Sequence, residues 1–189
     1  MITNRRLVDN SGSDFYPTPS WATIALAENE KFEGEIWEPA CGNGAMSEIL
    51  SRYNTRVLST DLNDNGYGLS GVDFLTKDYV SDNIVTNPPY NIAEDFVHAG
   101  LRKSRRKFCL LMRLAFLEGS KRANSIYLVN PPARVWVFSE RITFYRNGDS
   151  RAGETGNGTT AYAWIVWDKE VADKKTEMFW FKPGYKKMI

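Results

Sequence analysis

Short apolar runs alternate with amphipathic stretches along the first two-thirds of the chain. The pattern predicts strands at 35–37, 56–60, 72–74, 83–86 and 108–112. It predicts helices at 46–53 and 92–101, and an earlier helix with Thr18 as its N-cap and Pro19 in its first position. Three further strands, expected to be antiparallel, are predicted at 134–138, 161–167 and 178–181. This alternation predicts an α/β fold with a mostly parallel central sheet and antiparallel strands near the C-terminus.

The strand at 83–86 runs directly into Asn87-Pro88-Pro89-Tyr90. The two prolines fix the backbone and remove two donors, so the turn is stiff. The side-chain oxygen of Asn87 and the carbonyl of Pro88 are two acceptors suited to localising the lone pair of a conjugated amine, such as the exocyclic amine of adenine. Tyr90 adds an aromatic face for the base. A plain strand-ending turn would use the same residues, so the tetrapeptide alone leaves both interpretations open.

Acidic side chains follow three successive predicted strands. Glu38 opens a glycine-rich turn, Asp61 ends the second strand with Leu62 after it, and Asp73-Phe74 ends the third. The glycines allow a close approach of backbone to ligand. Glu38 is a poor neighbour for a pyrophosphate but suits a cation, such as the ammonium of S-adenosylmethionine. Each acid alone is as well explained by a cap or a solvated turn; together, at the ligand-binding edge of an open α/β sheet, they predict a cofactor pocket.

Length and composition predict one domain over residues 1–189. A chain of 189 residues has room for one ordinary core, and no apolar run is long enough to cross a bilayer. The basic start at 1–6 is followed by polar residues rather than by the apolar region of a signal peptide. We therefore expect a cytoplasmic protein with no membrane contact.

The cysteines and the histidine exclude several kinds of site. Cys41 and Cys109 lack disulfide or zinc spacing, so we expect both to be reduced. His98 is the single histidine and follows a helical pattern, which argues for a place on a helix surface or in packing, and against a Ser-His-Asp triad. No metal is expected. With 24 basic and 23 acidic residues, any nucleic-acid surface must come from local separation of charge.

In their order along the chain, these motifs resemble those of DNA adenine-N6 methyltransferases, in particular the small phage and prophage members. The matching segments are 14–19, 38–44, Asp61, Asp73-Phe74 and 87–90, and the likeness extends to about Trp167. It implies a Rossmann-like class I methyltransferase fold, S-adenosylmethionine as cofactor and an adenine flipped out of DNA. By this resemblance Phe15, Pro17 and Thr18 enclose the methionine part of the cofactor. Phe144 would be a second stacking partner for the base, with Tyr145 as a weaker candidate.

The expected site is then complete. Its catalytic residues are Asn87, Pro88, Pro89, Tyr90 and Phe144. Its cofactor-binding residues are Phe15, Tyr16, Pro17, Thr18, Glu38, Pro39, Ala40, Cys41, Gly42, Gly44, Asp61, Leu62, Asp73, Phe74 and Asn87.

The DNA-binding residues are expected after the strands. The basic run at 102–107 precedes a strand, so it should lie at the far edge of the sheet as a solvated basic face. Better candidates are Arg113, Lys121, Arg122, Arg146 and Arg151, the last two in or beside the polar loop 147–160. That loop is either a clamp on the phosphate backbone or an ordinary hairpin connection. Unlike the larger enzymes, the chain shows no separate target-recognition domain, so we expect short or relaxed sequence specificity.

Two other functions remain open. One is methylation of RNA or of a protein amide, because Asn-Pro-Pro-Tyr also serves such enzymes. The other is an inactive cofactor-binding module that regulates by binding DNA. We expect a monomer or weak dimer in a bacterial or phage-infected cell, with self-protection, regulation and partnership with a restriction enzyme all open as its role.

Overall fold

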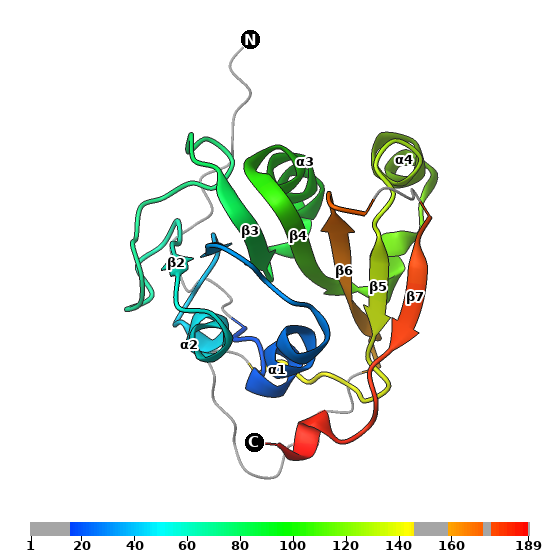
Figure 1. Ribbon diagram of the computed structural model, residues 1–189, viewed down its shortest axis with the longest axis horizontal. Helices are drawn as coiled ribbons and strands as arrows, with labels where there is room; N and C mark the ends of the chain where they lie inside the picture. Colours follow the sequence, from blue (N-terminus) through cyan, green and yellow to red (C-terminus); the bar gives the residue numbers. More distant parts are fainter. Residues whose placement is uncertain (1–15, 146–158, 172–174, 189) are drawn as a thin grey trace.

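The computed structural model describes residues 16–145, 159–171 and 175–188. Seven strands form a single sheet in the order β2-β1-β3-β4-β6-β5-β7, with helices on both of its faces (Figure 1). The strands are β1 (Ile36–Glu38), β2 (Val57–Ser59), β3 (Ser81–Thr86), β4 (Ser104–Arg113), β5 (Arg134–Val137), β6 (Tyr162–Asp168) and β7 (Glu177–Trp180). The α-helices are α1 (Ser20–Asn29), α2 (Ala45–Tyr53), α3 (Ala93–Lys103) and the single turn α4 (Ser120–Arg122). Tighter or wider turns are η1 (Tyr90–Ile92), η2 (Leu114–Leu117), η3 (Ala123–Tyr127) and η5 (Tyr185–Lys187).

The predicted α/β class and the mostly parallel sheet are confirmed. Strands β2, β1, β3 and β4 pair in parallel, and β6 pairs antiparallel with both β4 and β5. Strand β7 pairs in parallel with β5. Only β6 therefore runs against the others, and the expectation that all three C-terminal strands are antiparallel is wrong for β5 and β7.

Two local predictions near the start of the site are also wrong. Residues 72–74 form a turn instead of a strand, because Asp73 accepts hydrogen bonds from the backbone N–H groups of Leu75 and Lys77 through its side chain and carbonyl. An aspartate that binds its own backbone in this way competes with strand pairing. Thr18 is not the cap of α1, since Pro19 precedes the first helical residue and the Thr18 hydroxyl bonds elsewhere.

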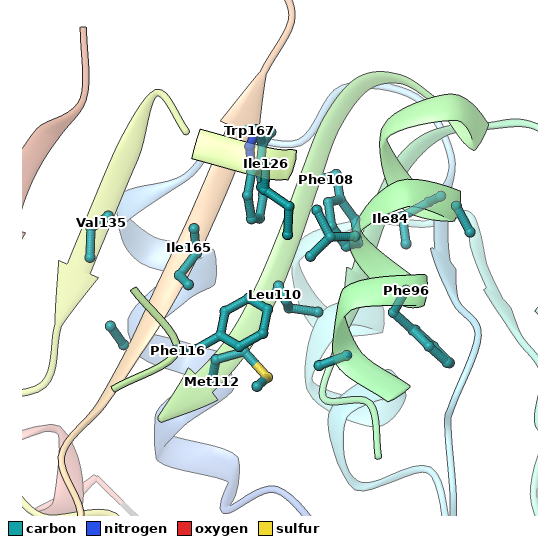
Figure 2. Packing of buried hydrophobic residues seen from close by; sticks show 14 of the residues in the cluster. Ile84, Phe96, Phe108, Leu110, Met112, Phe116, Ile126, Val135, Ile165 and Trp167 are labelled. Carbon is teal, nitrogen blue, oxygen red and sulfur yellow. The ribbon is translucent and has the colours of Figure 1, made fainter. Parts of the chain in front are cut away.

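Alternate side chains of β4 supply the two cores on either side of the sheet. Phe108, Leu110 and Met112 pack with α3 on one face, whereas Cys109 and Leu111 pack with α1 and α2 on the other. Figure 2 shows the first of these clusters, to which Phe96 of α3 and Ile84 of β3 both belong. A strand buried on both faces has a continuous apolar sequence, as β4 does from Phe108 to Met112.

The basic run lies at the amino edge of the parallel strands, as predicted, and it is a solvated face only in part, since Arg102 and Arg105 are exposed. Lys107 is buried and pairs with Glu30 at 2.8 Å, and Arg134 binds the same carboxylate. Arg106 pairs with Glu33 and Glu170, each at 2.9 Å. Acidic residues distant in sequence therefore neutralise much of this run. No helix in the described ranges is long and apolar enough to span a membrane.

Candidate active site

The tetrapeptide 87–90 begins where β3 ends and turns the chain toward α3. Pro89 has φ −56° and leads into the single turn η1, after which α3 starts at Ala93. Proline is confined to this φ, so the sequence itself fixes the turn. Asn87 is thereby held at the carboxyl edge of the parallel strands, where open α/β sheets bind their ligands.

The two ends of the Asn87 amide have different surroundings. Its Nδ2 donates a hydrogen bond of 3.0 Å to the hydroxyl of Thr18, and its Oδ1 is buried with no hydrogen-bond partner among the described residues. A buried acceptor without a partner costs about 1–3 kcal/mol. An acceptor left open in this way suits a ligand that brings its own N–H donor, as the tetrapeptide predicted.

A cationic side chain lies over the ring of Tyr90. The guanidinium carbon of Arg113, the last residue of β4, lies 5.0 Å from the ring centroid, within the range of a cation–π contact. Burial raises the pKa of Tyr90 well above its usual range, and the neighbouring phenol of Tyr162 adds to that rise. Tyr90 is therefore a neutral aromatic surface at any physiological pH.

Tyr162 joins the two predicted stacking residues and was missed by the sequence reasoning. Its ring lies 6.4 Å from that of Tyr90 and 5.0 Å from that of Phe144. Tyr162 begins β6 opposite Arg113, the end of β4. The signal was an aromatic residue at the start of a predicted strand, but only the antiparallel direction of β6 brings that start to the carboxyl edge of the parallel strands.

The glycine-rich turn is anchored by Asp61. The two oxygens of this buried carboxylate accept the backbone N–H groups of Gly42 and Asn63, each at 2.8 Å. The ends of β1 and β2 are therefore brought together, as the acidic spacing predicted. Leu62, directly after Asp61, is 61% exposed and available to an apolar ligand surface.

Glu38 lies at the base of this turn and is only 2% exposed. Burial raises the pKa of Glu38 to about 8, the hydroxyl of Ser47 acts in the opposite direction by hydrogen bonding, and the charge of Asp61 raises it further. Within the described residues no lysine or arginine forms an ion pair with Glu38 or Asp61. Two buried acids without a cation fit a positively charged ligand.

Tyr67 covers the end of the glycine-rich turn and is a second residue that the sequence reasoning missed. Gly44 has φ +85°, and a Cβ built on it would lie 2.4 Å from the Tyr67 ring. The Cys41 thiol also contacts the carbonyl of Tyr67 at 3.5 Å. Burial and nearby carboxylates raise the pKa of this thiol to about 12, so Cys41 is a neutral packing residue. In the turn between Glu38 and Cys41, Pro39 is buried and Ala40 is half-buried.

Other predicted residues have placements that bear on their roles. The Phe74 ring is 2% exposed and packs 5.0 Å from Trp37 and 4.7 Å from Phe96, so it belongs to the core. Asp73 lies in the turn just before it. Tyr16 is exposed and Pro17 is half-buried as the chain approaches Thr18. Phe15, Arg146 and Arg151 lie outside the described residues.

Two of the predicted DNA-binding cations are engaged within the fold. Arg122 donates to the carbonyls of Phe116 and Glu118, each at 2.9 Å, and its guanidinium lies 5.2 Å from the Phe116 ring. Lys121 pairs with Glu94 at 2.9 Å but is 83% exposed. These contacts give Arg122 a structural role and leave Lys121 at the surface near the start of α3. In the described part of the chain no cluster of three or more His, Cys, Asp or Glu side chains is arranged to hold a metal ion.

Comparison with solved structures assigns the fold. The type I restriction-modification methyltransferase subunit of Streptococcus thermophilus matches with a TM-score of 0.61 at 14% identity, over 91% of this chain and 48% of that one. A putative class I S-adenosylmethionine-dependent methyltransferase from Listeria monocytogenes matches with a TM-score of 0.59 at 15% identity, over 87% and 64%. The fold is that of the class I methyltransferases.

A third match was solved with S-adenosylmethionine bound. It is the magnesium protoporphyrin IX methyltransferase of Synechocystis PCC 6803, with a TM-score of 0.51 at 12% identity over 79% of this chain and 78% of that one. The chain spans about half the length of the restriction-modification subunit. No protein-family model matches the sequence, and no curated protein matches it.

Proposed function

We propose that this protein is an S-adenosylmethionine-dependent DNA methyltransferase that methylates N6 of adenine. The observation that carries the proposal is the unpaired, buried Oδ1 of Asn87, at the end of β3 and followed by Pro88. An amine bound there donates one N–H to Oδ1 and the other to the Pro88 carbonyl. Both bonds favour a nitrogen whose lone pair has left the ring, which makes it a better nucleophile.

The cofactor pocket that we propose lies between the ends of β1 and β2. Glu38 supplies the charge for the ammonium group, the glycine-rich turn from Pro39 to Gly44 lets the backbone approach, and Asp61 accepts ribose hydroxyls with its remaining lone pairs. Leu62 lies against the adenine ring of the cofactor. S-adenosylmethionine, when bound, supplies an electrophilic methyl group on a positively charged sulfur. No metal and no covalent enzyme intermediate are required.

The target adenine stacks on Tyr90, with Phe144 as the second aromatic partner held through Tyr162. Flipping a base costs a few kcal/mol of unstacking, and stacking on an aromatic side chain returns about 1–3 kcal/mol. Arg113 and Lys121 contact the phosphate backbone from the same edge of the sheet. Because most of the described chain forms the sheet and its helices, we expect a short recognition sequence or relaxed specificity.

RNA and protein amides are the other substrates to be tested. An RNA methyltransferase from Pyrococcus horikoshii, described as putative, also shares the fold, with a TM-score of 0.54 at 9% identity. The order of the motifs and the resemblance they carry favour DNA. An inactive regulatory module is disfavoured by the open acceptor of Asn87, which such a module has no need to maintain at a cost in stability.

The test is transfer of a labelled methyl group to DNA, RNA and protein side by side, with N6-methyladenine identified by mass spectrometry. We expect label in DNA only. Asn87→Ala should lower the rate by about 10²–10³-fold, the usual effect of removing one aligned group. Cofactor affinity measured by calorimetry should stay near the wild-type value. Label in RNA or protein alone would show that DNA is not the substrate. Normal turnover of Asn87→Ala would show that Asn87 is not catalytic.

A further inference from the structure

The hydroxyl of Thr18 is the partner that holds the proposed catalytic amide. Thr18 lies just before α1 and is 7% exposed, and its Oγ1 accepts the 3.0 Å hydrogen bond from Asn87 Nδ2 across 69 residues of sequence. The opposite end of the same amide is the buried Oδ1 without a partner. The hydrogen bond to Thr18 therefore occupies one end of the Asn87 amide and leaves the other end open to a ligand.

This contact matters because the terminal torsion of asparagine is broad and nearly two-fold. An amide turned by half a revolution would present its NH2 group, with two donors, to a target amine that also donates. Two donors cannot form a hydrogen bond, so only the orientation with Oδ1 toward the target is productive. In this structure the Thr18 hydroxyl accepts from the NH2 end and so holds the amide plane. A hydroxyl can also donate, so the hydrogen bond fixes the plane, and the target amine, which only donates, selects the orientation with Oδ1 toward it.

We propose that Thr18 is a positioning residue for Asn87, in addition to any contact it makes with the cofactor. The inference rests on the proposed function, since it assigns the same amide to catalysis. Thr18 would link the segment expected to enclose the methionine part of the cofactor to the group that binds the target amine. The orientation of Asn87, in the last of the motifs along the chain, then depends on a side chain in the first of them.

The chain offers a matched control for the test. Thr23 is a fully buried threonine on α1 whose hydroxyl has no hydrogen-bond partner within the described ranges. Thr18→Val and Thr23→Val each replace a buried hydroxyl by a methyl group of similar size. Thr18→Ser keeps the hydroxyl of Thr18 and loses only a methyl group. A general effect on folding of replacing a buried threonine by valine should appear in the melting temperatures of both valine variants.

Single-turnover methyl transfer at saturating cofactor and DNA is the first measurement. We expect Thr18→Val to be slower by about 10- to 100-fold, below the usual effect of removing an aligned group altogether. Thr18→Ser should recover most of the rate, and Thr23→Val should match wild type. In the Asn87→Ala background, Thr18→Val should cause no further loss, because coupled residues are not additive. A loss of cofactor affinity with an unchanged rate, or full additivity, would overturn the inference.

A second measurement does not depend on activity. The side-chain NH2 resonances of Asn87, assigned by their absence in Asn87→Ala, should exchange with solvent faster in Thr18→Val than in wild type or Thr23→Val. Equal exchange in all three proteins would show that Thr18 does not hold the amide. This readout fails separately from the proposed function, which is tested by whether wild-type protein methylates DNA at all.

Discussion

The guanidinium of Arg113 lies over the ring of Tyr90, 5.0 Å from its centroid, so a cation already covers part of the surface proposed for the target base. Cation–π contacts at exposed sites are worth about 0.5–1 kcal/mol, which is small beside the energy of base stacking. A base entering the site can therefore displace the guanidinium. Arg113 would then be placed to contact the phosphate that the flipped nucleotide leaves near the edge of the sheet.

Arg113→Gln should weaken binding to all DNA sequences about equally. The loss of one phosphate contact should flatten the plot of log affinity against log salt by about one unit. Arg105→Gln is the control, because Arg105 lies at the amino edge of the sheet and pairs with Asp82 at 3.4 Å. Fluorescence titrations at several salt concentrations measure both slopes. Equal slopes for the two variants would show that Arg113 does not contact DNA.

Asp61→Ala should weaken cofactor binding by about 1.5–3 kcal/mol, the value of hydrogen bonds to a charged acceptor. The structure adds a second effect, because Asp61 also accepts the N–H groups of Gly42 and Asn63. The variant should therefore melt at a lower temperature even without cofactor. Calorimetric titration and thermal unfolding separate the two effects. Unchanged cofactor affinity would place the ribose elsewhere.

Glu38 should make both stability and cofactor binding depend on pH. Its pKa in the folded chain is about 8, above the usual 4.5, chiefly because of burial, with the charge of Asp61 adding to the rise. The folded state thus holds a proton that the unfolded state releases, and this contribution to stability is lost as pH rises through 8. In thermal unfolding, Glu38→Gln should melt above wild type by a margin that grows from pH 5 to about pH 8 and then levels off.

Cofactor binding should show the opposite trend. A cationic ligand favours the carboxylate of Glu38, so wild-type affinity should increase as pH rises toward 8, with proton release below that pH. Calorimetry in buffers of different ionisation enthalpy measures the released proton. Glu38→Gln should bind more weakly and release none. A wild-type affinity that is flat from pH 6 to pH 8.5 would mean that Glu38 does not face the ammonium group.

Gly44→Ala, in the glycine-rich turn, should lower the stability of the fold by more than its backbone angle alone explains. Gly44 and Gly66 have nearly the same conformation, φ +85° and +79°, but a Cβ on Gly66 meets nothing within 4 Å. The left-handed conformation costs about 1–2 kcal/mol for either alanine. Only Gly44→Ala adds the clash with Tyr67. Thermal unfolding should show the larger loss for Gly44→Ala, partly restored by Tyr67→Ala; equal losses would remove Tyr67 from the account.

The sequence predicted those parts of the site that local chemistry determines. Asn87 and its prolines follow a buried strand, and Glu38 and Asp61 end the two neighbouring strands, so their meeting at one edge followed from the parallel pattern. The contacts that hold these groups were not predictable in the same way. The bond between Thr18 and Asn87, and the approach of Tyr162 to Tyr90, depend on which distant segments the fold brings together.

The errors have two different origins. Residues 72–74 have a strand-like composition, but the Asp73 side chain and carbonyl bind the following backbone and stop the strand. The run at 102–107 is basic in sequence, yet Lys107 pairs with Glu30 at the C-terminal end of α1. Hydrogen bonds to the backbone directly after Asp73 decided the first outcome, whereas a side-chain partner distant in sequence decided the second, and a single sequence does not show such a distant partner.

The ion cluster around Glu30 has a consequence for experiments that score residues by activity. Glu30 ends α1 and is bound by Lys107 and Arg134, while the other end of that helix is preceded by Thr18. Removing one partner from a buried ion pair costs about 3–5 kcal/mol. Release of α1 at this end would also loosen the segment that holds Asn87. A saturation screen selecting for methylated DNA would rank Glu30 beside the proposed catalytic residues, although it lies at the opposite edge of the sheet.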